Sequence, residues 1–432
     1  MKKNKKLVYV GLSADILHNG HINILKTANK LGSVTVGLLT DEAIASYKSI
    51  PTLDYNQRAI ILKNLKLVNR VIPQKTLDYR SNLNLLKPDY VVHGDDWKKG
   101  VQAKTRQQVI TTLKKWRGKL IEPKYTKNIS SSLIKSKLKN NLEPNSRVSI
   151  LKRLLDNKKI VRVLEAHSPL SGLIIENLEV KSKNKNEQFD AMWSSSLTDS
   201  SVKGKPDNQS LDFSSRFRDL GDLFDITTKP LIFDADNGGR IEHLSFSVKT
   251  LERLGVSTIM IEDKKGLKKN SLFKDQSGAQ QDTIKDFCKK IDVIKKTRKS
   301  RDFLIGARIE SFILGKGLQD GLKRAIAYSK AGADLILIHS KEKTPKEIFL
   351  FAKKFKKSKY FKPLVSVPST YSKTTEKQLF ENGFKVVIYA NQLLRAAFPA
   401  MEYAAKTILK NKRSFELENK ISSVKEIINL IK

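Results

Sequence analysis

Eight short apolar runs recur along the C-terminal two-thirds of the chain, and they constrain its fold more than any other feature. Each run has the length of a buried strand, and stretches with helical apolar spacing separate the runs. Eight strands that alternate with helices predict a (β/α)8 barrel, which we place over residues 151–432. The runs are IVRVLEAHS (160–168), FDAMWSSS (189–196), PLIFDADNG (230–238), VSTIMIED (256–263), FLIGARIE (303–310), ADLILIHS (333–340), PLVSVPS (363–369) and FKVVIYAN (384–391).

The first third of the chain has a shorter version of the same alternation. Strand-like runs begin at residue 7 and include LVYVGLSA, SVTVGLLTD, RVIPQ, YVVHGDDW and KLIEPKY. This pattern predicts a second α/β domain, with a Rossmann-like parallel sheet, over residues 1–142. The polar stretch NLEPNSR contains a proline and separates the two patterns, so we expect a linker at residues 143–150.

The charge of the chain limits the classes of partner. Its 82 Lys and Arg residues outnumber 44 Asp and Glu residues and give a formal net charge of +38, but lysine is spread over nearly every expected helix and loop. A nucleic-acid site normally clusters basic residues and places aromatic residues among them, so a solvated lysine-rich surface is favoured over a nucleic-acid partner. No run approaches the roughly 20 apolar residues of a membrane span, and the start lacks a signal-peptide core, so we expect a cytoplasmic protein without membrane contact.

Charged residues follow several of the barrel strands, at the ends where barrels carry their active sites. Asp234 and Asp236 end one run and Glu262 ends the next. Carboxylates on two adjacent strands suit Mg²⁺, although acidic strand ends can also cap the helices that follow. Arg308 and His339 come from the next two strands, and an arginine fork suits a phosphoryl or carboxylate group. The residues therefore predict a magnesium site that binds a small anion.

Four segments in this region resemble the phosphoenolpyruvate mutase branch of the phosphoenolpyruvate mutase and isocitrate lyase superfamily. The resemblance covers roughly residues 150–432. It implies a Mg²⁺-dependent isomerase that converts phosphoenolpyruvate to 3-phosphonopyruvate in phosphonate biosynthesis. The segments are EDK (262–264) followed after five residues by NS (270–271), LEAHSPLSG (164–172), WSSSLTDS (193–200) and KGKPD (203–207).

The resemblance also implies roles for individual residues. Lys268 and Asn270 fall on a loop, roughly residues 263–275, that closes the site against water. Asp207 lies beside the phosphoryl group and either accepts it transiently or positions it. The catalytic set is completed by Arg308 and His339. The remaining implied residues are Asp234, Asp236 and Glu262 for the metal, and Trp193, Ser195, Ser196, Leu197, Asp234 and Arg308 for the substrate.

Two other activities occur among similar barrels. The lyases carry a KKCGH motif that this chain lacks, and phosphonopyruvate hydrolase is expected to carry a different residue in place of Asn270. Isomerisation is therefore our leading interpretation. A phosphonopyruvate hydrolase or a 2-oxo-acid lyase, joined to a non-catalytic nucleotide-binding domain, is the alternative.

The N-terminal domain carries GLSADILHNGH, which places His18 and His21 between the first strand and a helix. Two such histidines can bind a metal, but a helix N-terminus with a nearby glycine suits a phosphate better. Residues 7–140 resemble the HxGH nucleotidyltransferases, particularly the cytidylyltransferases. The resemblance implies that both histidines stabilise the α-phosphate of CTP while pyrophosphate leaves. The implied nucleotide-binding residues are Ser13, His18, His21, Lys48, Asp95, Ser130 and Ser131.

This domain departs from the similar family at one position, because Tyr125 stands where an arginine is usual. A lost arginine removes a fixed phosphate clamp, so a domain that binds a nucleotide without catalysis stays open beside an active one. If the domain is active, the fusion implies a phosphonate as acceptor of CMP. The resemblance further implies a homo-oligomer, dimer or tetramer, with exchanged barrel helices, and a phosphonopyruvate decarboxylase that consumes the product.

Overall fold

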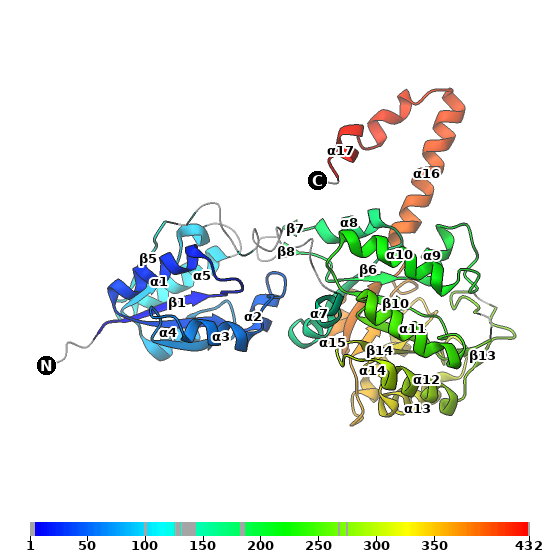
Figure 1. Ribbon diagram of the computed structural model, residues 1–432, viewed down its shortest axis with the longest axis horizontal. Coiled ribbons are helices and arrows are strands. Elements are labelled where there is room, and N and C mark those ends of the chain that lie inside the picture. Colours follow the sequence, from blue (N-terminus) through cyan, green and yellow to red (C-terminus); the bar gives the residue numbers. More distant parts are fainter. Residues whose placement is uncertain are drawn as a thin grey trace.

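In the computed structural model the chain folds as a sheet domain followed by a barrel, with a helical arm at the C-terminus (Figure 1). The structure describes residues 5–98, 102–124, 126, 131, 144–181, 186–266, 268–273 and 275–430. Two residues singled out above, Tyr125 and Ser130, lie outside these ranges.

The N-terminal domain is built on a parallel sheet of five strands in the order β3-β2-β1-β4-β5. Apolar side chains of α1 and α3 pack on one face of the sheet, and those of α4 and α5 pack on the other. The strand order reverses between β1 and β4, where α/β sheets bind their ligands. The elements are β1 (Leu7–Leu12), α1 (Asn19–Leu31), β2 (Ser33–Leu39), α2 (Asp41–Ala45), α3 (Tyr55–Lys63), β3 (Arg70–Gln74), α4 (Arg80–Leu86), β4 (Tyr90–Val92), the 3₁₀ helix η1 (Asp95–Lys98), α5 (Ala103–Lys114) and β5 (Lys119–Ile121).

The second domain is a closed barrel of eight parallel strands, as the sequence predicted. Side chains alternate along each strand: in β10, Ile232 points into the barrel, whereas Leu231 and Phe233 pack against the surrounding helices. The strands, in their order around the barrel, are β10 (Leu231–Asp234), β11 (Thr258–Glu262), β14 (Leu304–Ile309), β15 (Leu335–Ile338), β16 (Leu364–Ser366), β17 (Phe384–Tyr389), β6 (Val161–Glu165) and β9 (Ala191–Ser194).

Helices surround the barrel, and two antiparallel strand pairs extend its loops. These pairs, β7–β8 and β12–β13, were not predicted, because strands of two residues carry no readable alternation. The helices are α8 (Pro169–Asn177), α9 (Ser196–Ser201), α10 (Phe213–Ile226), α11 (Ile241–Leu254), α12 (Ile284–Thr297), α13 (Gly317–Ala331), α14 (Lys346–Phe355), α15 (Glu376–Glu381) and α16 (Gln392–Asn411). The added strands are β7 (Val180–Lys181), β8 (Asn186–Glu187), β12 (Lys264–Lys265) and β13 (Gln280–Gln281).

The expected linker at residues 143–150 is largely helical, because α7 runs over Pro144–Asn157. Proline fits the first turn of a helix, where its missing N–H costs no hydrogen bond. Val148, Leu151 and Leu154 recur at helical spacing and are buried against the barrel. The polar stretch that indicated a boundary is therefore the start of a helix that caps the barrel.

The C-terminal arm consists of α16, the 3₁₀ helix η4 (Phe415–Lys420) and α17 (Val424–Ile428), and it leads away from the barrel (Figure 1). No described residue of α16 is buried. Within the described ranges, no helix combines the length and the apolar character that crossing a membrane requires.

Candidate functional site

The carboxyl ends of the barrel strands surround one cavity, and ten residues predicted from the sequence line it. They lie on β9, β10, β14 and α9, directly after β9 and β15, and in the loops that follow α9 and β12. The ten are Trp193, Ser195, Ser196, Leu197, Asp207, Asp234, Lys268, Asn270, Arg308 and His339. The other two predicted residues, Asp236 and Glu262, contact members of this set, namely Lys268 and Arg308.

Lys268 provides a buried positive charge among carboxylates. Its Nζ lies 2.9 Å from Asp207 Oδ1 and 2.5 Å from Asp236 Oδ1, and it also donates to Ser196 Oγ. Burial opposes the charge of the ammonium, but Asp236, Asp234 and Asp207 outweigh burial and raise the pKa of Lys268. The side chain is therefore charged at neutral pH.

Asn270 contacts the other oxygen of the same aspartate. Its Nδ2 donates to Asp207 Oδ2 at 2.7 Å, while its Oδ1 accepts from the backbone N–H of Leu272 at 2.9 Å. Lys268 and Asn270 thus hold both carboxylate oxygens of Asp207 from one loop. Lys268, Asn270 and Leu272 of this loop line the cavity, and closure of the loop over a ligand stays a prediction.

Ser271 is a residue of the site that the sequence interpretation missed. Its Oγ donates to Glu310 Oε2 at 2.5 Å and accepts hydrogen bonds from Lys264 Nζ and Arg308 Nη2, both at 2.8 Å. This loop is therefore hydrogen-bonded to side chains at the carboxyl end of β14. Ser271 follows Asn270 directly in the quoted motif, so the motif itself was the available signal.

Besides Ser271, Arg308 contacts three other side chains of the site. Its Nε donates to Glu310 Oε1 at 2.6 Å, its Nη2 donates to His339 Nδ1 at 2.9 Å, and Nη2 lies 3.3 Å from Glu262 Oε2. His339 Nδ1 also lies 3.3 Å from Glu310 Oε1, but its contact with Arg308 is shorter. Because arginine can only donate, Nδ1 accepts the hydrogen bond from Arg308 and carries no proton. Burial and the charge of Arg308 lower the pKa of His339, so the ring is neutral with its proton on Nε2.

Asp234, Asp236 and Glu262 carry the oxygens that could hold a metal ion. Both carboxylate oxygens of Glu262 are buried without a hydrogen-bond donor, and burial raises the pKa of this group to about 7. Among the described residues, no three His, Cys, Asp or Glu side chains form a direct ligand cluster. Magnesium takes only one or two direct carboxylates and keeps several waters. The neighbouring Asp234, Asp236 and Glu262 therefore fit a hydrated Mg²⁺ site.

Arg216 fixes the chain next to the cavity and was not predicted. Its Nη1 donates to the carbonyl oxygen of Asp234 at 2.6 Å, and its Nε donates to Asp199 Oδ2 at 3.0 Å. Asp199 also accepts from Ser194 Oγ at 2.7 Å. One buried guanidinium therefore joins the end of β10 to the segment that carries Ser195–Leu197.

A second cavity lies in the N-terminal domain, beyond the ends of β1 and β4. Five predicted nucleotide-binding residues line it: Ser13, His18, His21, Lys48 and Ser131. Lys48 Nζ donates to Ser13 Oγ at 3.2 Å, and Ser131 Oγ donates to the carbonyl oxygen of Ile16 at 3.1 Å. The predicted Asp95 does not line this cavity, whereas its neighbour Asp96 does.

The two histidines of this cavity are locked into one tautomer. His18 caps α1, since its Nδ1 accepts from the backbone N–H of Gly20 at 3.2 Å, and His21 Nδ1 accepts from the backbone N–H of His18 at 3.4 Å. Burial lowers the pKa of His18, and burial together with His18 and Lys48 lowers the pKa of His21 to about 4. Both rings are therefore neutral near pH 7, with a proton on Nε2 that suits an anionic ligand.

The phosphoenolpyruvate phosphomutase family matches residues 151–409. The chain belongs to this family. A second family, described as cytidylyltransferase-like, matches residues 9–137. The two matches lie on opposite sides of the boundary expected near residue 142, and residues 1–142 and 151–432 remain our proposed domains.

Relatives of the phosphomutase barrel include proteins named for two activities. A phosphoenolpyruvate phosphomutase from Tetrahymena pyriformis is 33% identical over 69% of this chain and 95% of its own length. A phosphonopyruvate hydrolase from Variovorax is 34% identical over 65% of this chain and 93% of its own length. The N-terminal domain is 38% identical to a glycerol-3-phosphate cytidylyltransferase from Bacillus spizizenii, over 22% of this chain and 74% of that protein.

Solved structures give the same assignment. A phosphoenolpyruvate phosphomutase from Streptomyces platensis superposes with a TM-score of 0.60 and 31% identity, over 66% of this chain and 94% of that chain. A phosphonopyruvate hydrolase in complex with oxalate and Mg²⁺ superposes with a TM-score of 0.58 and 32% identity, over 67% and 95%. Overall identity therefore does not separate mutase from hydrolase.

Proposed function

We propose that the barrel interconverts phosphoenolpyruvate and 3-phosphonopyruvate, and that this reaction supplies phosphonate biosynthesis. The observation that carries the proposal is the contact of both Asp207 oxygens with the loop, at 2.9 Å from Lys268 and 2.7 Å from Asn270. A loop that reaches the phosphoryl position excludes water from it. An isomerase needs water to be excluded, whereas a hydrolase must admit water to the phosphoryl group.

The isomerisation breaks the bond between phosphorus and the enol oxygen and forms a bond between phosphorus and carbon three. A loose transition state spreads negative charge over the phosphoryl oxygens, which donors in a dry site stabilise. Arg308, His339, Asn270 and Lys268 supply such donors around the cavity. Asp207 accepts the phosphoryl group transiently or orients it.

Asp234, Asp236 and Glu262 would hold Mg²⁺ in this proposal, and the two buried Glu262 oxygens that lack a hydrogen-bond donor support the assignment. When bound, the ion supplies positive charge that stabilises the enolate of pyruvate. Ser196 Oγ donates to Asp234 Oδ2 at 3.0 Å, which orients this carboxylate. The hydrolase remains the second candidate, since a relative of similar identity carries that name.

Lys268→Ala should turn the isomerase partly into a hydrolase. Removal of the ammonium leaves Asp207 and Asp236 without their cation, so the loop should open and admit water. We expect the ratio of pyruvate and phosphate to phosphoenolpyruvate, formed from phosphonopyruvate, to rise roughly tenfold or more. Lys269→Ala is the matched control, because the Lys269 side chain pairs with the exposed Asp275. An unchanged product ratio in Lys268→Ala would contradict the role of the loop.

For the N-terminal domain we infer transfer of CMP from CTP to a phosphonate, with release of pyrophosphate. The acceptor oxygen would bond to the α-phosphorus as the bond to the leaving pyrophosphate breaks. The neutral pair His18 and His21 offers donors from Nε2, and Lys48 adds a positive charge in the same cavity. A nucleotide-binding domain without catalysis is the alternative.

Pyrophosphate release from CTP in the presence of 2-aminoethylphosphonate or hydroxyethylphosphonate tests this inference. His21→Ala should lower the rate about 100-fold, as the loss of one transition-state donor typically does. His243→Ala, at an exposed position on α11, is the control and should keep the rate. CTP binding without pyrophosphate release would favour the non-catalytic alternative.

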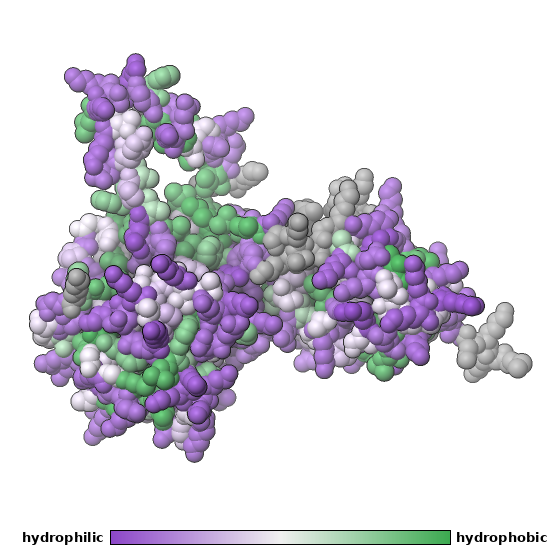
Figure 2. Space-filling model, turned by 180° about the vertical axis from the view of Figure 1, so that it is seen from behind, coloured by the Kyte–Doolittle hydropathy of each residue, from purple (hydrophilic) through white to green (hydrophobic). Residues whose placement is uncertain are grey.

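A homo-oligomer and a decarboxylase complete the proposed partners. Phosphoenolpyruvate is the favoured side of the isomerisation, so an enzyme that removes phosphonopyruvate is required. Apolar side chains gather where the arm leaves the barrel (Figure 2). Leu170 and Ile174 of α8 and Phe398 and Met401 of α16 are all more than a third exposed. Such a surface supports association with a second copy of the chain.

Substitution on the arm tests the association. We expect Phe398→Asp with Met401→Asp to shift the protein from a dimer or tetramer to a monomer, measured by light scattering at about micromolar concentration, because charges on a contact surface must lose their hydration. Lys406→Ala, an exposed change on the same helix, should leave the mass unchanged. A wild-type monomer would contradict the proposal.

A further inference from the structure

The segment Lys48–Leu53 connects the nucleotide cavity to the barrel. It follows α2, begins with the predicted phosphate contact Lys48 and ends just before α3. We call these six residues the strap. Because they are outside any helix or strand, their conformation depends on side-chain contacts from both domains.

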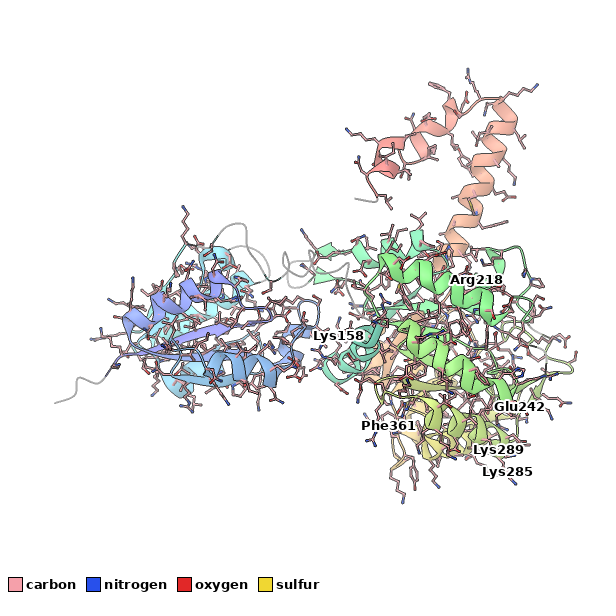
Figure 3. All side chains as sticks on the ribbon, in the orientation of Figure 1. Lys158, Arg218, Glu242, Lys285, Lys289 and Phe361 are labelled. Carbon is pink, nitrogen blue, oxygen red and sulfur yellow. The ribbon has the colours of Figure 1, made fainter. Side chains whose placement is uncertain are left out.

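The barrel holds the strap through α7. Arg153 of this helix donates from Nη2 to the carbonyl oxygen of Pro51 at 2.6 Å and from Nη1 to that of Thr52 at 3.0 Å. Ile50 packs against the cluster that contains Leu151 and Leu154 of α7 and the inward side chains of the strands. Lys158, at the end of α7, lies on the side of the barrel that faces the N-terminal domain (Figure 3).

The N-terminal domain holds the other side of the strap. Asp15 Oδ1 accepts from the backbone N–H of Thr52 at 2.6 Å and from that of Leu53 at 3.3 Å. Arg58 donates to the carbonyl oxygens of Leu53 and Ser13. Ser13 Oγ also accepts a hydrogen bond from Lys48 Nζ. The loop after β1 is therefore hydrogen-bonded to the first residue of the strap as well as to its last two.

We propose that Arg153 of the barrel is a positioning residue for the nucleotide site, and that it acts through the strap on Lys48. The proposal rests on the nucleotide-binding function proposed above. Lysine has a long and flexible side chain, so the place of its charge depends on a fixed backbone. Arg153 fixes two consecutive carbonyl groups of that backbone from outside the domain. The barrel thereby serves as part of the scaffold of the nucleotide site.

The test is CTP binding to the full chain by titration calorimetry. Arg153→Ala should weaken binding about fivefold, the order expected for lost hydrogen bonds, and Arg153→Lys should weaken it less. Lys152→Ala is the matched control, because this neighbour on α7 pairs instead with Asp302 of the barrel at 2.9 Å. Formation of phosphoenolpyruvate should be unchanged in all three variants, which shows that the barrel is folded.

A double-mutant cycle shows whether Arg153 acts through Lys48. In the Lys48→Ala background, Arg153→Ala should have little further effect, since the group it positions is absent. Equal effects in both backgrounds, or no effect of Arg153→Ala alone, would overturn the proposal. If the wild type does not bind CTP, the proposed nucleotide function fails. Hydrogen exchange at the amides of Thr52 and Leu53 then decides separately whether Arg153 orders the strap: faster exchange in Arg153→Ala supports this, and unchanged exchange contradicts it.

Discussion

Replacement of Asp207 by alanine should lower the rate of phosphoenolpyruvate formation from phosphonopyruvate roughly 1,000-fold or more, as loss of a group at the reacting centre does. The carboxylate contacts Lys268 and Asn270 at the cavity, so its removal deletes the group beside the transferred phosphoryl and two loop contacts together. Pyruvate kinase and lactate dehydrogenase, coupled to the reaction, would report phosphoenolpyruvate continuously.

The control for this variant is Asp219→Ala, because Asp219 lies on α10 and forms an exposed pair with Lys203. Asp207→Asn separates the two roles left open for the carboxylate. An amide can still orient a phosphoryl group but cannot accept it, so residual activity in Asp207→Asn would favour positioning. Near-normal activity in Asp207→Ala would remove Asp207 from the mechanism.

Arg308→Ala should be both inactive and unstable. The guanidinium is buried and lies between Glu262 and Glu310, whose contacts with it are 3.3 and 2.6 Å. Its removal leaves buried carboxylates without their partner, a change that typically costs about 3–5 kcal/mol of folding free energy. We expect a lower midpoint for unfolding of the barrel in urea or by calorimetry.

A conservative variant and a control accompany Arg308→Ala. Arg308→Lys keeps a positive charge but loses the planar fork, so it should recover part of the stability and little activity. Arg301→Ala, at an exposed position before β14, should match the wild type in both. Wild-type stability of Arg308→Ala would show that the neighbouring carboxylates do not depend on its charge.

The barrel could be predicted from the sequence because each strand is a continuous apolar run that ends in polar residues. Site residues were predicted where they lie at the carboxyl ends of strands, as Asp234 and Arg308 do, or in a motif, as Asn270 does. Lys264 and Arg216 were missed for a physical reason. In a chain with 82 Lys and Arg residues, a buried cation looks like a surface cation until its carboxylate partners are placed in space.

In the N-terminal domain, too, the sequence predicted residues of the site but not how their side chains are placed. His18 and His21 were predicted as a pair, and their tautomer became evident only from the backbone N–H groups that each Nδ1 accepts. Asp95 and Asp96 are neighbours in the segment GDDW, and only Asp95 was predicted to bind the nucleotide. The 3₁₀ helix η1 begins there and turns successive side chains by about 120°, which brings Asp96 to the cavity. The contact of Arg153 with the strap crosses about 100 residues of sequence and left no local signal.

Phosphorus NMR of the purified chain with Mg²⁺ and phosphonopyruvate tests the central claim most directly, because it follows substrate and every phosphorus product together. We predict that the phosphonate resonance is replaced by that of phosphoenolpyruvate, with little inorganic phosphate, and that Asp207→Ala shows no conversion. Inorganic phosphate as the only product would identify a hydrolase, and an unchanged phosphonate resonance would contradict the assignment of this barrel to phosphoryl isomerisation.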